Sequence, residues 1–256
     1  MNLTDDARWR PRTRTLWALA LCFLLTYAMS FPPFGLWWLI FLSPVVFAVL
    51  VLAPLRTRTM LLPVFVASCL LWGWFHWWVS GITSAGYGPM VVYLAGVTTL
   101  AALLLRAMTR GGLGLPIWAA LPLTLTGVDY LRGLIIFDGY PWFLHAQPLI
   151  DFPQFAELAR IGGVWLPGLI ALALSGCFAS WLLCVLRMKP AGSWHLAGVV
   201  AVILCLGVLG HALFEGRSQF RVPQAISILP RGANYQIMVA DRDNSRVALF
   251  KSDGSW

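Results

Sequence analysis

The sequence contains little charge. Only 11% of its 256 residues are Asp, Glu, Lys or Arg, whereas 59% are hydrophobic. Soluble globular domains carry about 25% charged residues. A chain with so few charges cannot cover a surface that faces water, so this composition excludes an ordinary soluble domain.

The sequence also lacks the common catalytic and metal-binding motifs. It contains no Gly-x-x-x-x-Gly-Lys loop, no His-Glu-x-x-His and no Gly-x-Ser-x-Gly. We therefore expect no cofactor, no metal site and no complete set of catalytic residues in this chain. Thiols inside apolar segments usually act as small buried hydrophobic groups, so we expect no disulfide among Cys22, Cys69, Cys177, Cys184 and Cys205.

The formal net charge of +8 raises the question of nucleic acid binding. A nucleic-acid-binding domain gathers Lys and Arg on one face, but here these residues separate apolar runs. Membrane topology explains the basic balance better, and we expect no nucleic acid partner.

Apolar runs long enough to cross a membrane recur along the chain. A helix needs about 20 residues to cross the roughly 30 Å hydrocarbon core, although tilt and short spans widen this range. After a basic leader, residues 1–15, seven apolar runs predict an all-α membrane domain over residues 16–214. Their approximate bounds are 16–30, 36–53, 60–79, 90–105, 115–130, 164–186 and 194–214.

The first run follows Arg8, Arg10, Arg12 and Arg14, which is also how a secretory signal peptide begins. No cleavage site with small residues stands out after Ser30, and further spans follow, so we predict an uncleaved helix. We expect a short loop with turn-forming glycines at Thr83–Gly88, between the third and fourth spans.

The distribution of Lys and Arg predicts the orientation. If the spans alternate, ten positive charges fall on one side of the membrane. They are the four arginines of the leader and Arg56, Arg58, Arg106, Arg110, Arg187 and Lys189. Cytoplasmic segments are enriched in Lys and Arg, so the pattern predicts a cytoplasmic N-terminus and an external C-terminus.

Residues 215–256 are polar and predict an extracytoplasmic segment, here called the tail. Tyr235–Ala240 and Arg246–Phe250 are typical of two short strands joined by Asp241–Ser245. We expect a β-hairpin-like and incomplete domain, because a single hairpin is only marginally stable in water.

The candidate site lies at the outer end of the fifth span and in the long connection after it. Asp129 and Arg132 are three residues apart, so their side chains can meet on one helix face. They could bind a lipid headgroup or form a structural ion pair. Long loops are often functional, and Tyr140, Trp142 and His145 place aromatic and polar groups at headgroup depth. For His145 a structural role is favoured over a catalytic one, because no carboxylate stands at a fixed short spacing; His76 is isolated near a span end.

Several motifs resemble the apolipoprotein N-acyltransferases of bacterial inner membranes, over roughly residues 15–215. They are Phe31–Trp38, Gly73–Ser80, Asp129–Gly133, Gly139–Trp142 and Ile161–Val164. The third and fourth resemble the family's Glu-Trp-Leu-Arg and Phe-Pro-Trp motifs, with Asp129, Tyr130 and Tyr140 replacing Glu, Trp and Phe. Trp142 matches the family tryptophan that lies beside the lipid-facing entrance.

The resemblance implies a multi-pass protein of the bacterial inner membrane whose partners are phospholipid and a lipoprotein substrate. Family enzymes move an acyl chain from a phospholipid, through a cysteine thioester, to the α-amino group of a diacylglyceryl-cysteine. Their Glu, Lys and Cys lie in a nitrilase-like domain inserted after the seventh helix. Only about forty residues follow Phe214 here, too few for such a domain, and no Cys follows Cys205. We expect a truncated chain that is inactive alone.

The tail itself resembles one blade of an NHL-type β-propeller, in Ile237–Asp241, Asn244–Val247 and Asp253–Gly254. The alternative is therefore a membrane anchor or sensor without enzymatic activity that carries a propeller outside the cell. A transporter is a third hypothesis, which the near absence of ionisable residues inside the spans disfavours.

Overall fold

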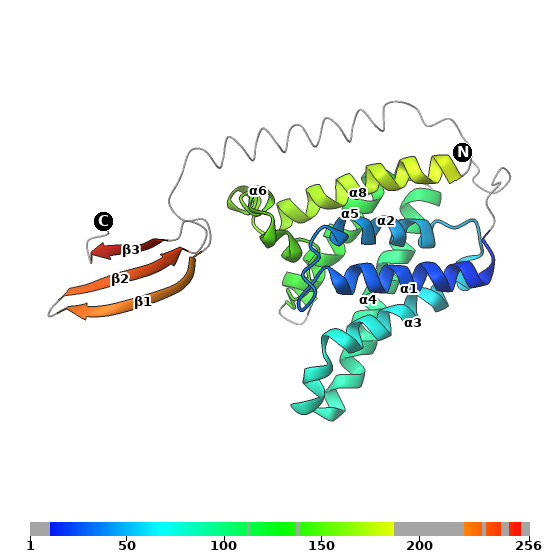
Figure 1. The fold of residues 1–256 in the computed structure, drawn as a ribbon. Coiled ribbons are helices and arrows are strands. Elements are labelled where there is room, and N and C mark those ends of the chain that lie inside the picture. Colours follow the sequence, from blue (N-terminus) through cyan, green and yellow to red (C-terminus); the bar gives the residue numbers. More distant parts are fainter. Residues whose placement is uncertain are drawn as a thin grey trace. The chain divides into compact units, whose positions relative to one another are not determined.

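The computed structural model describes residues 11–111, 113–136, 139–186, 223–231, 234–241 and 246–251. The chain divides into two compact units, Met1–Gly207 and Val208–Trp256. In the described residues the first unit is helical and the second is a small β-sheet (Figure 1).

Within the described residues of the first unit there are six helices of 13 to 27 residues. Their bounds are α1 Thr13–Met29, α2 Leu39–Val51, α3 Thr57–Phe75, α4 Ser84–Arg110, α5 Ile117–Tyr130 and α8 Trp165–Leu186. Shorter helical segments connect them: 3₁₀-helix η1 Trp77–Gly81, π-helix η2 Leu131–Ile135, 3₁₀-helix η4 Gln147–Asp151, α6 Pro153–Ala156 and α7 Ala159–Gly162.

Each of the first six predicted spans overlaps one of these helices. By length and composition, α3, α4 and α8 could cross a membrane, while α1 and α2 are shorter apolar helices. The 13 residues of α2 would reach only about 20 Å, short of a hydrocarbon core. The seventh predicted span lies outside the described residues.

The loop predicted at Thr83–Gly88 is wrong, because α4 begins at Ser84 and includes the glycines. Thr83 is the N-cap of α4, and its hydroxyl oxygen accepts a hydrogen bond from the amide of Gly86 at 3.1 Å. Such a cap satisfies an amide that the first helical turn leaves without a partner, which lets the helix start early.

The six helices form a closed ring through their packing. Each contacts its two neighbours in the cyclic order α1, α2, α8, α5, α4, α3. The buried face of α8 is made largely of small residues, including Gly168, Ala171, Ser175 and Gly176, which allow close helix approach. A Cβ on Gly176 would come within 3.0 Å of the Trp118 backbone in α5.

Arginines gather at one end of the ring, where α1 and α3 begin and α4 ends. Arg12 and Arg14 stand at the start of α1, and Arg56 and Arg58 at the start of α3. Arg106, at the end of α4, is 8% exposed and donates to the carbonyl oxygens of Val51, Ala53 and Leu55 at 2.5–3.3 Å. Arg110 donates to Leu52 and Ala53. These two guanidinium groups cap the carbonyl end of α2.

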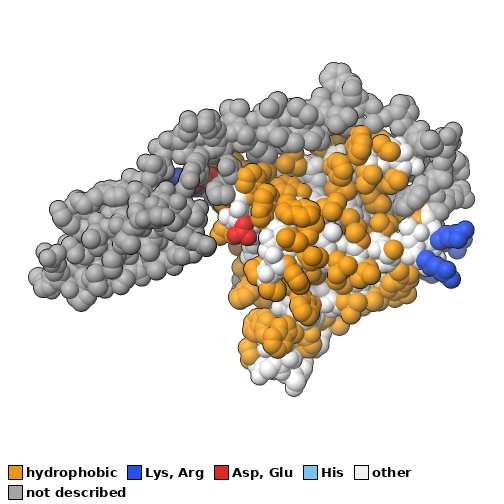
Figure 2. Space-filling model, in the orientation of Figure 1, with side chains coloured by type: hydrophobic (Ala, Val, Ile, Leu, Met, Phe, Trp, Pro, Cys, Tyr) orange, Lys and Arg blue, Asp and Glu red, His pale blue; other side chains and the backbone are white. Residues whose placement is uncertain are grey.

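Large hydrophobic side chains are exposed along the described helices of this unit. Figure 2 shows hydrophobic side chains over the visible face of the helices. In Figure 1 the hairpin of α3 and α4 extends past the other helices. Its tip around η1 carries Trp74, Trp77 and Ile82, which are 58%, 68% and 74% exposed. Aromatic and aliphatic side chains exposed to this extent are expected where lipid, not water, is the surrounding medium.

The second unit is a three-stranded antiparallel sheet in the order β1, β2, β3. The strands are β1 Pro223–Arg231, β2 Asn234–Asp241 and β3 Arg246–Lys251. The two predicted strands lie within β2 and β3, where Ile237 pairs with Phe250. The sequence reasoning missed β1, which contains Pro223 and Pro230; proline cannot donate to a ladder and suits an edge strand.

Candidate functional site

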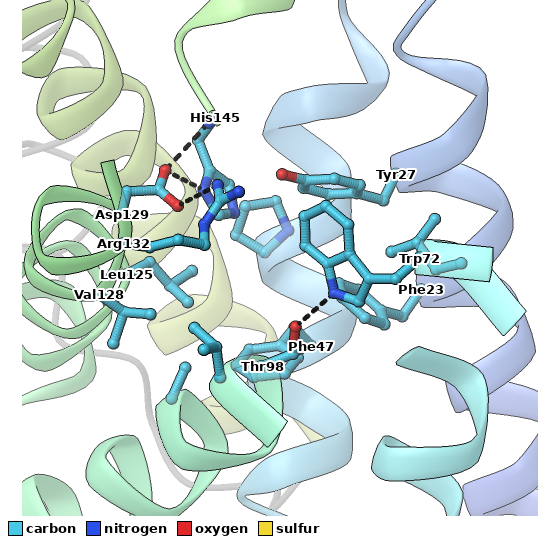
Figure 3. Close-up of a pocket in the computed structure, with 14 residues that line it drawn as sticks. Phe23, Tyr27, Phe47, Trp72, Thr98, Leu125, Val128, Asp129, Arg132 and His145 are labelled. Atoms are coloured by element: carbon cyan, nitrogen blue, oxygen red, sulfur yellow. Dashed lines mark hydrogen bonds and ion pairs between the residues drawn. The ribbon is translucent and has the colours of Figure 1, made fainter. Parts of the chain in front are cut away.

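A pocket lies among five helices of the ring. Its empty volume is about 500 Å³, counting the space that opens to solvent. Most of its walls are apolar or aromatic, and Asp129, Arg132 and His145 lie together near the ends of α1, α3 and α5, away from the arginine end (Figure 3). The lining residues are Phe23, Tyr27, Pro44, Phe47, Leu71, Trp72, Val97, Thr98, Ala101, Leu125, Val128, Asp129, Arg132 and His145.

Asp129 and Arg132 form an ion pair at the polar end of the pocket. Arg132 Nη2 lies 3.3 Å from Asp129 Oδ1, as the three-residue spacing predicts. Asp129 is in the last turn of α5, and Arg132 is in the π-helical turn η2 that continues it. Both side chains are buried, at 11% and 2% exposure. Either charge would be costly to bury without the opposite charge beside it.

The remaining donors of Arg132 hold the loop between Gly139 and Gln147. Its Nη1 donates to the carbonyl oxygen of Trp142 at 2.7 Å, and Nη2 donates to that of Phe143 at 3.3 Å. The guanidinium carbon also lies 5.1 Å from the centre of the Trp72 ring. Arg132 therefore joins α5, α3 and the loop, and its guanidinium is occupied by protein groups.

His145 also binds Asp129. The backbone amide and Nδ1 of His145 lie 3.1 Å and 2.8 Å from Asp129 Oδ2. Its ring meets Tyr27 edge to face, with centroids 5.3 Å apart. The sequence offered no carboxylate close to His145, but the fold brings one from 16 residues earlier. This contact corrects the view of His145 as a histidine without an orienting group.

Phe143 holds the loop in place with its ring and its carbonyl oxygen, although its backbone is strained. It has φ 56°, a left-handed conformation that non-glycine residues rarely adopt. Its ring stacks on Phe75 at 4.1 Å, and its carbonyl oxygen accepts hydrogen bonds from Arg132 and from the hydroxyl of Tyr27, the latter at 2.8 Å. The sequence reasoning missed both Phe143 and Tyr27, because nothing local marks them.

Tyr140 pairs with His76, which the sequence reasoning treated as isolated. The Tyr140 hydroxyl lies 2.6 Å from His76 Nε2, and His76 Nδ1 lies 2.9 Å from the carbonyl oxygen of Trp72. Because a carbonyl only accepts, Nδ1 carries the proton, and Nε2 of the neutral ring accepts from Tyr140. Burial raises the pKa of Tyr140 to about 12, partly offset by the Arg132 charge, so the hydroxyl stays protonated.

Trp142 does not line the pocket. Its side chain is 53% exposed, and its ring lies 6.2 Å from that of Trp78 and 6.3 Å from that of Tyr140. Of the five predicted site residues, Asp129, Arg132 and His145 thus meet at the pocket, while Tyr140 and Trp142 belong to the same loop but do not line the pocket.

Two glycines allow close contacts at η2, Gly139 for the loop and Gly133 for α8. Gly139 has φ 91°, and a Cβ there would lie 2.4 Å from the carbonyl oxygen of Gly133. A Cβ on Gly133 would lie 2.7 Å from the Trp165 ring. The amide of Tyr140 donates to the carbonyl of Arg132 at 2.7 Å across this contact. A larger residue at Gly139 would move the loop away from η2, whereas a larger residue at Gly133 would displace the Trp165 ring.

A comparison with protein-family models matches residues 23–177 to the apolipoprotein N-acyltransferase N-terminal domain. The match covers more than half of the chain and includes all the pocket residues. The chain belongs to this family. A comparison with curated proteins gives no match.

Membership of the apolipoprotein N-acyltransferase family, together with the three long apolar helices, identifies a membrane-type protein. At a coarse level it also relates the chain to lipid and lipoprotein substrates. In this acyltransferase-family domain, the matched region carries the ion pair, the loop and the pocket on one continuous segment.

Proposed function

We propose that this chain is a lipid-holding membrane domain of an apolipoprotein N-acyltransferase-like protein. The reaction of such a protein would transfer an acyl chain from phospholipid to the α-amino group of a lipoprotein diacylglyceryl-cysteine. The observation that supports the proposal most directly is the pocket, whose walls are apolar and whose polar end holds Asp129, Arg132 and His145. Apolar cavities with a few converging polar groups are the usual form of small-molecule sites.

In this proposal the pocket binds lipid and does not carry out the thioester step. None of its 14 lining residues is a cysteine, and a thioester requires a thiol. The catalytic Glu, Lys and Cys would come from outside the described residues. The chain would lie in the bacterial inner membrane with seven spans, a cytoplasmic N-terminus and an external C-terminus.

Phospholipid binding by the purified chain tests the proposal. Native mass spectrometry in detergent would compare the wild type with Arg132→Ala and Trp142→Ala. We expect Arg132→Ala to weaken binding about tenfold, because the loop loses the guanidinium that holds two of its carbonyls. Trp142→Ala removes an exposed ring of the loop itself and should also weaken binding.

Trp118→Ala is the matched control, because Trp118 is also about half exposed but lies at the start of α5, far along the helix from Asp129. Unchanged lipid binding in both Arg132→Ala and Trp142→Ala would reject the proposed site. Release of lysophospholipid by this chain alone would instead reject the separation of lipid binding from catalysis.

The second candidate is a membrane anchor or sensor with an extracytoplasmic propeller. It is supported by the three-stranded antiparallel meander of the second unit, since propeller blades are small antiparallel sheets. Sequencing the gene beyond the codon of Trp256 would distinguish the candidates. Repeated blades would favour the anchor, and a nitrilase-like sequence with Glu, Lys and Cys would favour the enzyme.

A further inference from the structure

Among the described residues, one side of the His145 imidazole is without a hydrogen-bond partner. Its Nδ1 is bound to Asp129, while Nε2 makes no hydrogen bond within the part of the chain that the structure describes. The ring lines the pocket and is 12% exposed. In Figure 3 it lies between the Asp129 carboxylate and the rings of Tyr27 and Trp72. Nε2 is therefore a polar atom available to a molecule in the pocket.

The contacts of Asp129 determine which ring nitrogen of His145 carries a proton. Its Oδ2 accepts from the amide of His145 and lies 2.8 Å from Nδ1, and its Oδ1 accepts from Arg132. The Arg132 guanidinium and the His145 amide can only donate, and the Arg132 charge keeps the carboxylate ionised. An ionised carboxylate only accepts, so Nδ1 carries a hydrogen.

The charge balance of the cluster favours a neutral imidazole. Arg132 already compensates the single negative charge of Asp129. Protonation of His145 would add a second positive charge among side chains that are 2–12% exposed, with no further carboxylate lining the pocket. An uncompensated buried charge is costly. In the neutral ring Nε2 is a hydrogen-bond acceptor.

We propose that His145 selects the headgroup of the bound lipid, its Nε2 accepting a hydrogen bond from an N–H or O–H group of that headgroup. The inference rests on the proposed lipid-binding function. Asp129 is a positioning residue that fixes the tautomer and the ring, and Arg132 positions the loop without touching the lipid. A headgroup amine or hydroxyl fits this acceptor, whereas a quaternary ammonium has no donor for it.

A series of lipids with identical acyl chains tests the selection. Phosphatidylethanolamine, its monomethyl and dimethyl derivatives and phosphatidylcholine keep one positive charge but carry three, two, one and no N–H donors. Native mass spectrometry of the full chain in detergent would give relative affinities. We expect similar binding of the first three lipids and about tenfold weaker binding of phosphatidylcholine, where the last donor is lost.

Two substitutions assign the selection to His145. His145→Phe keeps a ring beside Tyr27 but removes Nε2, so the first three lipids should bind as weakly as phosphatidylcholine, which should be unaffected. His145→Gln, the more conservative change, retains an acceptor and should keep part of the selection. Tyr130→Phe is the matched control, because Tyr130 is 45% exposed beside Asp129 and its hydroxyl does not line the pocket.

The outcomes separate this inference from the proposed function. Equal binding of the dimethyl and choline lipids by the wild type would overturn the selection while leaving lipid binding intact. Equal weakening of all four lipids in both His145 variants would assign His145 a structural role and also overturn it. Absence of binding to every lipid would reject the proposed function itself.

Discussion

Phe143 shows how single residues keep the loop against the pocket. Its left-handed backbone costs about 1–3 kcal/mol in most proteins and persists only where neighbouring contacts offset it. Here the contacts are the stacked Phe75 ring and hydrogen bonds from Tyr27 and Arg132 to one carbonyl oxygen. The loop conformation therefore depends on side chains from α1, α3 and η2.

Removal of the Tyr27 hydroxyl should loosen this loop. Tyr27→Phe keeps the aromatic ring but deletes the 2.8 Å hydrogen bond to Phe143, so we expect a loss of about 1 kcal/mol in the free energy of unfolding. Reversible unfolding in mixed detergent would measure it. Hydrogen exchange at the amides of residues 139–147 should rise in the same variant.

Tyr130→Phe makes the same chemical change on an exposed tyrosine of α5 and should alter stability by less than about 0.5 kcal/mol. An equal effect of the two substitutions would show that the Tyr27 hydroxyl does not restrain the loop.

The sequence could predict only the site contacts that arise within one helical turn. Asp129 and Arg132 are three residues apart, and their side chains meet. His145 and Asp129 are separated by 16 residues and an irregular loop, and His76 and Tyr140 by 64 residues. Such pairs depend on helix packing, which no local spacing encodes.

At the scale of elements, the end of α2 depends on α4. α2 has only 13 residues, and its last carbonyls have no partners within the helix. Arg106 and Arg110, one turn apart on α4, donate to carbonyls of residues 51–53 and 55. A short helix in an apolar medium can end here because these donors form hydrogen bonds with its free carbonyl oxygens.

Arg106→Ala should therefore destabilise the ring of helices. The substitution leaves the carbonyl oxygens of Val51 and Leu55 without their charged donor and Ala53 with Arg110 alone, and we expect a loss of about 3 kcal/mol in the free energy of unfolding. Unfolding in mixed detergent would measure the loss.

Arg106→Lys should recover only part of this stability, because an ammonium cannot reproduce the planar fork that reaches several carbonyls. Arg58→Ala, at an exposed position at the start of α3, should change stability by less than about 0.5 kcal/mol. A comparable loss in Arg58→Ala would attribute the effect to net charge and not to the cap.

At the scale of the whole helical unit, the arginines and the pocket lie at different depths. Arg56, Arg58, Arg106 and Arg110 mark one end, whereas the Asp129, Arg132 and His145 cluster lies toward the other. If the positive-inside rule orients the unit, the arginine end faces the cytoplasm and the polar end of the pocket faces outward. An external site would match the seven-span, N-in and C-out proposal.

Cysteine accessibility tests that orientation. In a cysteine-free background, Ile82→Cys at the exposed tip of the α3 and α4 hairpin should react with a membrane-impermeant maleimide on intact cells. Arg58→Cys should react only after lysis, and Ser252→Cys in the tail should react from outside. Labelling of Arg58→Cys in intact cells would reverse the orientation, and protection of Ser252→Cys would contradict an odd number of spans.

The sequence by itself determined the class of protein, the helical segments and the family. Hydropathy locates a helix because each apolar run must satisfy its own backbone hydrogen bonds in lipid, a requirement that local sequence can meet. The predicted sixth span, 164–186, and α8, Trp165–Leu186, differ by one residue for this reason. The motifs around Asp129 and Gly139 likewise pointed to the family that the comparison shows.

Only the tertiary structure decided what the site residues do. It showed that Arg132 holds the loop, that Asp129 orients His145, and that Trp142 lies outside the pocket. It also brought Tyr27, His76 and Phe143 into the same cluster. These assignments depend on how the helices close into a ring, and that closure is a property of many packing contacts between residues far apart in the chain.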